Sequence, residues 1–426
     1  MRLAAAAGLV AVTLLAAGST LHTGYEPLQP GGDPRVRRAP SAEELRPGVE
    51  AAFRSESYVP GTLATLRFFD DADDVRLQVF HAGPERIRTV GPSEMRGVPV
   101  SRELEIGDAP AGRTIRVAVG RWPSGLYFAR LDAADGRVGF APFVVGSRRL
   151  GASRVAVVMP TFTWQAYNIR DDDGDGVGNS WYANRFDDVV HLDRPFLNRG
   201  VPFRFREYDL RFLHWLARHG KHVDFLTDGS LDRVPSAAAL ARAYDLVVFP
   251  GHDEYATKHE YDVVEGYRNL GGSLAFLSAD NFYWRVVRRG NVLVRTGAWR
   301  NLGRPEAALI GVQYRASMPR FGRYVVGGAG SAPWLLAGTG LRSGSLFGHG
   351  GIEIDSADAS SPSDVKVVAR IPNVFGPGID ADMTVYSTKR GGTVFAAGAF
   401  TLAASSVRPE VSRLLENLWQ RATDRL

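Results

Sequence analysis

The sequence predicts an α/β fold, a doubly wound parallel sheet preceded by a smaller β-sandwich. Between about residues 49 and 146, short runs of alternating apolar and polar residues are typical of antiparallel strands with one buried face. After about residue 152, solid apolar runs alternate with helical periodicity, which is typical of parallel strands joined by helices. The length of 426 residues is enough for two or more domains.

The first 20 residues have the features of a secretory signal peptide. Arg2 supplies a positive charge, Leu3–Ala17 is almost entirely apolar, and small residues follow where a signal peptidase would cut. The apolar run of about 15 residues is short for a membrane span of roughly 20. We therefore expect cleavage and a secreted protein without membrane contact; an uncleaved membrane anchor is the less favoured alternative. Residues 21–48 are rich in Pro and Gly and lack hydrophobic periodicity, which predicts a disordered linker.

Composition excludes several classes of function. Cysteine is absent, which excludes disulfides, thiolate metal sites, iron–sulfur clusters and a cysteine nucleophile. The net charge is +5, and only four of the 51 basic residues are lysine. The arginines are spread along the chain and interleaved with acids, whereas a nucleic-acid binder usually concentrates them on one face or in one run. We therefore expect no nucleic-acid partner.

Residues 49–146 are expected to form an immunoglobulin-like β-sandwich. Val75, Leu77 and Val79 alternate with polar neighbours, and similar runs recur about every 10 residues between turn residues. Asp135-Gly136 is a hairpin turn signal. The segment resembles the immunoglobulin-like modules often attached to extracellular enzymes. Nothing in it looks catalytic, so we expect a spacer or packing role.

Residues 152–426 show the strand–helix–strand order of a parallel sheet with right-handed crossovers. The expected strands are Val155–Met159, Val223–Leu226, Leu246–Phe249, Ser273–Leu277 and Thr393–Ala397. One amphipathic helix ends at Gly220, a second begins with the capping box Thr257–Glu260, and a third begins at Pro409. Between about residues 288 and 390, helix signals are few and Gly is frequent, which predicts a β-rich insertion that overhangs the strand ends.

Three loops are the first places to look for chemistry, because ligands of open α/β sheets bind beyond the carboxyl ends of the strands. They are Pro160–Asn168, Gly251–Tyr255 and Ser278–Trp284. Gly251–Tyr255 combines an imidazole, two carboxylates and a phenol just before a helix. Its acids either help the helix to start, since the helix dipole favours negative charge there, or belong to a metal or acid/base site. Ser278 lacks the Gly-x-Ser-x-Gly setting, which argues against a serine hydrolase.

Taken together, these motifs resemble the C-terminal region of the N,N-dimethylformamidase large (beta) subunit family. The resemblance covers about residues 150–426 and is carried by Thr163–Asn168, Pro250–Tyr255, Gly271–Leu277, Asn281–Trp284 and Gly351–Asp355. It implies an amidotransferase-like α/β domain. It also implies a mononuclear iron, held by two tyrosines and a glutamate, that hydrolyses a small amide.

Residue by residue, the resemblance implies Tyr255 as one tyrosine and Glu353 as the glutamate. The strand that would carry the second tyrosine has none, so Tyr167 from the neighbouring loop is the candidate. Phenolate and carboxylate oxygens suit a hard ferric ion, and such a metal activates water for attack on an amide. His252, Asp253 and Asp280 are the candidate catalytic residues for proton transfer.

A second metal site is expected at the acidic run that follows. Asp171, Asp173 and Asp175 occupy alternate positions before a glycine, as at the start of a calcium loop, and Asn179 stands at position nine. Tyr182 occupies the position where an EF-hand has its glutamate, so this is no EF-hand. The run is either a solvated acidic turn or a structural Ca²⁺ site, and the mutual repulsion of dense carboxylates favours Ca²⁺.

Two classes of function stay open from the sequence. One is a secreted metal-dependent hydrolase that acts on an amide-type C–N bond of a small molecule. The other is a non-catalytic extracellular protein that binds a small molecule or carbohydrate and has a structural calcium site; a carbohydrate-active enzyme is a third, weaker alternative. The sequence leaves open the substrate, a small partner subunit and the formation of a homo-oligomer.

Overall fold

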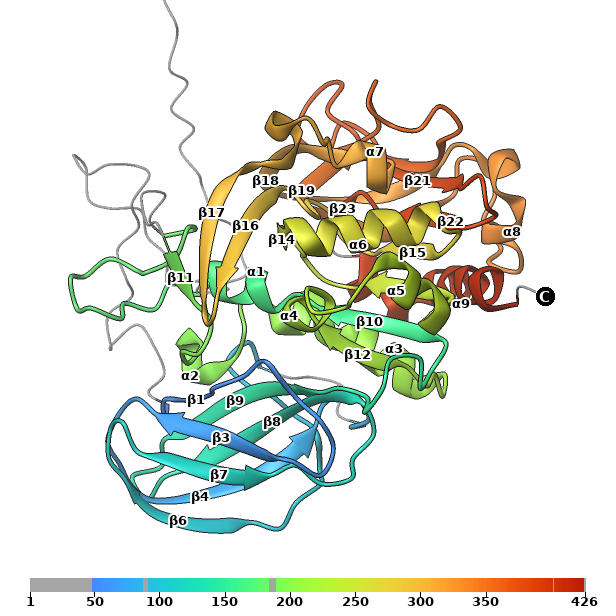
Figure 1. The fold of residues 1–426 in the computed structure, drawn as a ribbon. Coiled ribbons are helices and arrows are strands. Elements are labelled where there is room, and N and C mark those ends of the chain that lie inside the picture. The colour runs from blue at the N-terminus through green and yellow to red at the C-terminus, as the bar shows by residue number, and fades with distance from the viewer. Residues whose placement is uncertain (1–47, 87–90, 184–188, 401, 425–426) are drawn as a thin grey trace, which may run out of the picture.

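Two structural units follow one another along the chain (Figure 1). The computed structural model describes residues 48–86, 91–183, 189–400 and 402–424. The expected signal peptide and nearly all of the expected linker lie outside these residues. Within them, no helix combines the length and the apolar character that a membrane crossing requires.

The N-terminal unit consists of two sheets packed face to face. One sheet has the strand order β1-β3-β7, and the other β2-β9-β8-β4-β5, with β6 also paired to β4. The strands are β1 (Ala51–Phe53), β2 (Ser57–Tyr58), β3 (Leu63–Phe68), β4 (Ala72–His81), β5 (Val98–Pro99), β6 (Leu104–Ala109), β7 (Thr114–Ala118), β8 (Gly125–Asp132) and β9 (Val138–Val145). Val75, Leu77 and Val79 are fully buried between the sheets, as their alternation with polar neighbours predicts.

The C-terminal unit is built on one ten-stranded sheet with the order β12-β10-β13-β15-β22-β21-β20-β18-β19-β23. The first five strands are parallel: β12 (Asp224–Thr227), β10 (Val155–Met159), β13 (Leu246–Phe249), β15 (Ser273–Phe276) and β22 (Thr393–Ala396). The other five are antiparallel to their neighbours: β21 (Ala381–Ser387), β20 (Lys366–Ile371), β18 (Gln313–Val326), β19 (Leu346–Ser356) and β23 (Ala399–Phe400). Much of the segment expected as an insertion therefore extends the same sheet.

Helices cover both faces of the parallel strands. On β10, Ala156 and Val158 face the layer of α5 and α6, while Val155 and Val157 face the layer of α3 and α9. This period-two division lets an almost wholly apolar strand bury both faces. The helices are α1 (Thr161–Ala166), α2 (Leu197–Gly200), α3 (Arg211–Arg218), α4 (Asp228–Leu231), α5 (Ala237–Ala243), α6 (Lys258–Asn269), α7 (Ala307–Ile310), α8 (Pro333–Leu336) and α9 (Pro409–Thr423), with a π-helix at Arg206–Leu210 and 3₁₀ turns at Trp299–Leu302, Ala329–Ser331 and Leu402–Val407.

A smaller sheet closes the side of the parallel strands near α1. Its order is β11-β17-β16-β14, formed by β11 (Val189–His191), β17 (Val292–Ala298), β16 (Trp284–Arg289) and β14 (Tyr255–Thr257). The long β16–β17 hairpin reaches down beside α1 in Figure 1. Phe162 of α1 packs with Tyr255, Val286 and Leu293 of this sheet in one buried cluster. The small sheet thus fixes Tyr255 beside α1.

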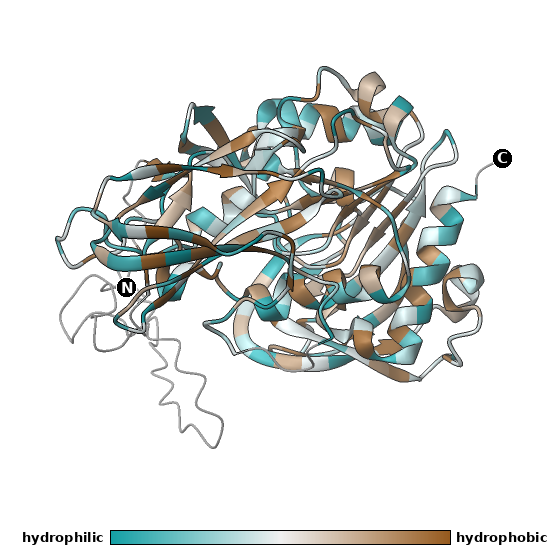
Figure 2. Ribbon diagram, turned by 90° about the horizontal axis from the view of Figure 1, so that it is seen from below, coloured by the Kyte–Doolittle hydropathy of each residue, from teal (hydrophilic) through white to brown (hydrophobic). Residues whose placement is uncertain are grey.

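The two units share a hydrophobic core. Leu126, Phe128 and Phe140 of the sandwich belong to the same buried cluster as Phe212 of α3 and Phe225 of β12. Figure 2 shows strongly hydrophobic strands in the sandwich and in the middle of the large sheet, with hydrophilic residues toward the outer helices. The sandwich therefore packs firmly on the α/β unit through its apolar surface.

A candidate metal centre at the carboxyl ends of the parallel strands

The chemically important side chains come from segments that follow adjacent parallel strands. His252 follows β13, Asp280 follows β15, and Tyr167 is the C-cap of α1, which follows β10. Glu353 approaches from β19, and Tyr255 begins β14. Segments far apart in the sequence meet here because the carboxyl ends of β10, β13 and β15 lie at one edge of the sheet.

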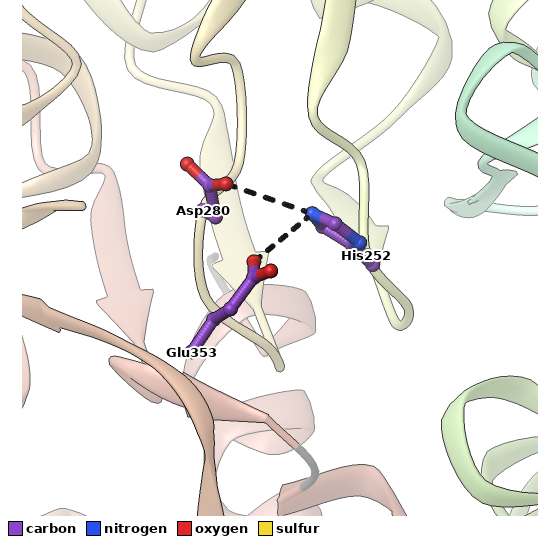
Figure 3. Close-up of side chains that lie close together, drawn as sticks. All are labelled: His252, Asp280 and Glu353. Carbon is purple, nitrogen blue, oxygen red and sulfur yellow. Dashed lines mark ion pairs between the residues drawn. The ribbon is translucent and has the colours of Figure 1, made fainter. Parts of the chain in front are cut away.

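The centre of this arrangement is a close group of one imidazole and three carboxyl groups (Figure 3 shows three of the four). The His252 Nε2 atom lies 3.5 Å from Glu254 Oε2, 3.6 Å from Glu353 Oε2 and 3.9 Å from Asp280 Oδ2. Candidate ligand atoms of His252, Asp280 and Glu353 all lie within 4.8 Å of one another. These separations exceed direct hydrogen bonds. They are close to the spacing of about 3.4 Å between tetrahedral ligands that each lie about 2.1 Å from a metal.

Three of the four facing atoms have no hydrogen-bond partner. His252 Nε2, Glu254 Oε2 and Glu353 Oε2 form no hydrogen bond, although His252 is only 4% exposed and Glu254 only 5%. Buried polar atoms are normally paired, and a buried charge without a counter-ion is costly. One cation between these four side chains would satisfy all the facing atoms at once. The residues present therefore fit a metal ion.

Burial keeps the cluster neutral when no cation is bound. It raises the pKa of Glu254 to about 8, with the Asp280 carboxyl adding to the effect. Burial likewise raises the pKa of Asp280 to about 8, and that of Glu353 well above its usual range, helped by Asp280 and Glu254. Burial lowers the pKa of His252 to about 4, against the opposing effect of Glu254. The imidazole is thus neutral with an available lone pair, and a metal would displace protons from the carboxyl groups.

Both candidate tyrosines border the cluster. The ring of Tyr167 lies edge-to-face with His252 at a centroid distance of 5.1 Å. Burial raises the pKa of Tyr167 and Tyr255 well above the usual value, and the Glu254, Asp280 and Glu353 carboxyl groups raise the pKa of both phenols further. Both phenols therefore stay protonated unless a nearby positive charge stabilises the phenolate.

Unusual backbone conformations flank the site. Asp280, Phe282 and Ile352 have φ angles of 51°, 56° and 67°, in the left-handed region that a β-branched residue such as isoleucine rarely adopts. The Asp280 backbone N–H donates to the buried Asp355 carboxylate at 2.9 Å, and the Phe282 N–H donates to the Asp253 carbonyl at 2.7 Å. Such conformations cost about 1–3 kcal/mol each and persist only where the surroundings hold them, typically at functional sites.

The Gly251–Tyr255 segment is held by neighbouring loops. The Glu254 N–H donates to Thr163 Oγ1 at 2.9 Å, and the Asp253 N–H donates to Asn281 Oδ1 at 3.3 Å. Thr163 and Asn281, like Glu254 and Asp355, were not singled out from the sequence. Glu254 stands within the segment Gly251–Tyr255, and Thr163 and Asn281 stand within the motifs Thr163–Asn168 and Asn281–Trp284. The sequence did not indicate in which direction each of these side chains points.

Asp253 differs from the other candidate catalytic residues. Its carboxyl group interacts with Asp228 and Asp209, and burial raises its pKa to about 8, with Asp209 adding to the shift. The structure brings His252 and Asp280 together with Glu353, whereas Asp253 belongs to a neighbouring buried group of acids.

The acidic run lies apart from this cluster. Carboxylate oxygens of Asp171, Asp173 and Asp175 lie within 4.8 Å of one another, on largely exposed side chains. Asp171 accepts from the backbone N–H groups of Gly174 and Gly176, at 2.7 and 2.9 Å. The Asn179 amide donates to Asp173 Oδ2 at 3.3 Å. The loop is folded around its own side chains, and calcium binding there stays a prediction.

Comparison with known proteins gives a family match over most of the chain. The model of the family described as "N,N-dimethylformamidase beta subunit-like, C-terminal" matches residues 110–405. The N,N-dimethylformamidase beta subunit of Alcaligenes sp. is 35% identical over 78 residues, which are 18% of this chain and 10% of that protein. The aligned region is thus only a small part of this relative.

Solved structures give much weaker similarities. A superoxide reductase (neelaredoxin) from Ignicoccus hospitalis has a TM-score of 0.19 at 9% identity and covers 25% of this chain and 87% of its own. The sporulation control protein Spo0M from Bacillus subtilis has a TM-score of 0.16 at 13% identity, over 24% of this chain and 48% of its own. Neither similarity is strong enough to indicate the fold or the function of this chain. On the family match, the chain belongs to the N,N-dimethylformamidase beta subunit-like, C-terminal family.

Proposed function

We propose that this protein is a metal-dependent hydrolase that cleaves an amide-type C–N bond in a small molecule. The observation that carries the proposal is the group formed by His252, Glu254, Asp280 and Glu353. Its carboxyl oxygens lie 3.5–3.9 Å from His252 Nε2, and His252 Nε2, Glu254 Oε2 and Glu353 Oε2 have no hydrogen-bond partner. The relative from Alcaligenes sp. is named as an N,N-dimethylformamidase subunit, which supports the choice of an amide bond.

The metal would be held by His252, Glu254 and Glu353, with Asp280 beside them and the phenols of Tyr167 and Tyr255 as further donors. Asp280 has the longest separation from His252 Nε2 and shares a hydrogen bond with Glu353, so it is the carboxyl group least suited to bind the cation directly. When bound, such a cation polarises a carbonyl group and lowers the pKa of water. The chain itself excludes bulk water, since His252, Glu254 and Asp280 are each at most 5% exposed.

Proton transfer would be the task of the carboxyl groups. Amide hydrolysis removes a proton from the attacking water and delivers one to the leaving nitrogen. With its pKa raised to about 8, Asp280 changes protonation near neutral pH, which suits a group that takes up and returns a proton. His252 is less suited, because its pKa is lowered to about 4 and its ring faces three carboxyl groups.

Iron is the metal that we propose, on the basis of the donor set. Carboxylate oxygens and the two phenols that border them are hard donors, which favour a hard ion over metals that prefer sulfur ligands. The buried phenols ionise only if a cation compensates the charge, because the neighbouring carboxyl groups oppose phenolate formation. A phenolate-to-iron absorption band would therefore report binding at this position directly.

The test combines metal analysis with an amide panel. The purified full chain is analysed for bound metals and its visible spectrum is recorded, and then amine release is followed from formamide, N-methylformamide, N,N-dimethylformamide and acetamide. We expect about one iron per chain, a visible band and release of amine from at least one of these amides. Glu353→Gln should lower both iron content and amine release by at least about tenfold, because it removes one charged donor.

Glu103→Gln, which changes an exposed residue of the sandwich, provides the matched control and should behave as the parent protein. Protein that stays metal-free after incubation with ferrous, ferric, zinc and manganese salts would overturn the metal site. A metal-loaded protein that releases no amine from any of these amides would overturn the proposed reaction on small amides.

A further inference from the structure

A small pocket opens directly beside His252 and is lined by residues of α1 and of the π-helix Arg206–Leu210. Four aromatic side chains form most of its wall, and its polar members are Asp209 and His252. The aromatic residues are Trp164, Tyr167, Phe203 and Tyr208. Its free volume of about 10 Å³ is the room that one water-sized group requires.

Asp209 supplies the only carboxyl group among the residues that line this pocket. It is 1% exposed and lies in the π-helix Arg206–Leu210, a kind of helical distortion that is frequent at functional sites. Its Oδ2 accepts a hydrogen bond from Trp164 Nε1 at 3.3 Å, whereas its Oδ1 has no partner. A Cβ atom on Gly251 would stand 2.4 Å from that Oδ1, so the free oxygen points at the backbone next to His252.

A free buried carboxyl group among aromatic rings is unfavourable unless a ligand satisfies it. Water alone would leave the charged form poorly solvated, and burial accordingly raises the pKa of Asp209 to about 8. Aromatic faces attract cations through their quadrupoles, and more strongly where water is excluded. A carboxylate together with several aromatic faces is therefore the arrangement that recognises an organic ammonium group.

We propose that this pocket is a binding subsite for a small ammonium group, held by Asp209 Oδ1 and the surrounding aromatic rings. The role of the subsite rests on the proposed function, because hydrolysis of an amide releases an amine, and this amine is protonated at neutral pH. The amine nitrogen released near His252 would then have a separate place to go, with Tyr167 and His252 common to the metal centre and the pocket. The limited volume favours ammonium or methylammonium over larger alkylammonium ions.

The surrounding charges are compatible with a cation. The Arg204 guanidinium lies 5.5 Å from the Phe203 ring centroid and brings a positive charge to this wall. Arg204 is partly exposed, so water screens its charge. On the inner side, Asp209 raises the pKa of Asp253 and Glu353 raises that of Tyr208, so the side of the pocket away from Arg204 is bordered by acids.

The test measures binding and does not depend on turnover. Methylammonium chloride is titrated into the metal-loaded full chain by calorimetry and by thermal unfolding, with potassium chloride and tetramethylammonium chloride at equal ionic strength. We expect a saturable effect for methylammonium, a weaker one for potassium and none for tetramethylammonium, which is too large for the pocket. Asp209→Asn should weaken methylammonium binding by at least about tenfold, because the pairing charge is lost.

Glu207→Gln is the control on the same π-helix and should leave the affinity unchanged, since Glu207 is paired with Arg206 and does not line the pocket. If Asp209→Asn does not fold, Phe203→Leu removes one aromatic face while keeping an apolar side chain, and it should weaken binding severalfold. Equal effects of methylammonium and potassium, or unchanged binding in these pocket variants, would overturn the subsite. Methylammonium binding by a protein that hydrolyses no amide would leave the subsite standing and refute only the proposed reaction.

Discussion

Replacing Glu254 by glutamine should stabilise the metal-free protein, although Glu254 belongs to the proposed centre. The pKa of Glu254 rises from its ordinary value of 4.5 to about 8 because the carboxyl group is buried next to Asp280. Between these two values the folded state holds a proton that the unfolded state has released. The free energy of unfolding must therefore fall as the pH rises from about 5 to 8.

The size of the effect follows from the same shift. Each pH unit within the window costs about 1.4 kcal/mol, so the full shift corresponds to an upper limit of roughly 5 kcal/mol. Glutamine keeps the shape of the side chain but cannot ionise. The variant should thus gain several kcal/mol over the parent protein at pH 8, which is about 5–10 °C in midpoint temperature for a domain of this size, and gain little at pH 5.

Thermal and urea unfolding of chelator-treated protein at pH 5, 6, 7 and 8 would measure this difference, with Glu103→Gln as the exposed control. Metal should reverse the order, because the parent carboxylate can bind the cation while the amide binds it weakly. If the parent protein and Glu254→Gln lost stability in parallel as the pH rises, the reasoning would be refuted, because ionisation of Glu254 would then have no free-energy cost from burial.

Three further predictions follow from other contacts. Tyr255→Phe should lower the iron content and weaken the visible band, measured by metal analysis and absorption spectroscopy, while Tyr261→Phe, a buried tyrosine of α6, should change neither. Calcium at millimolar concentration should raise the midpoint of thermal unfolding by a few degrees, and Asp173→Asn should abolish that rise; an equal rise with magnesium would contradict a calcium site. Glu56→Gln should cost about 1–3 kcal/mol in urea unfolding, because the half-buried Glu56 carboxylate pairs with Arg288 and accepts a hydrogen bond from Thr161; a change below about 0.5 kcal/mol would contradict a structural role of this carboxylate.

Local sequence patterns predicted several elements of the large sheet and of the helices that cover it. The apolar run Val155–Met159 is a strand buried on both faces, and the capping box at Thr257–Glu260 begins α6 with both of its hydrogen bonds formed. Both follow from interactions between near neighbours in the sequence. The strand expected to start at Val223 begins instead at Asp224, a difference of one residue at a strand end.

The sequence did not indicate how distant strands pair and bring the site residues together. Nothing in the pattern of β19 indicated that Gly351–Asp355 would pair with β18 through irregular register and turn Glu353 toward His252. The bulges and the left-handed backbone at Ile352 depend on contacts between strands that are distant in the sequence. Glu254 shows the same limit, because one position in a loop decides whether a carboxyl group joins the cluster or, like Asp253, the neighbouring acids.

The sandwich takes part in the geometry of the proposed site through Glu56. Its carboxylate accepts from Thr161 Oγ1 at 2.7 Å and pairs with Arg288 of β16 at 2.8 Å. Thr161 begins α1, whose C-cap is Tyr167, and β16 pairs in parallel with β14, which begins at Tyr255. One side chain of the sandwich therefore ties together the two elements that carry the two bordering tyrosines. A module that only spaced the α/β unit from its surroundings would not require this half-buried charge pair, so the sandwich is better understood as part of the scaffold that holds the centre.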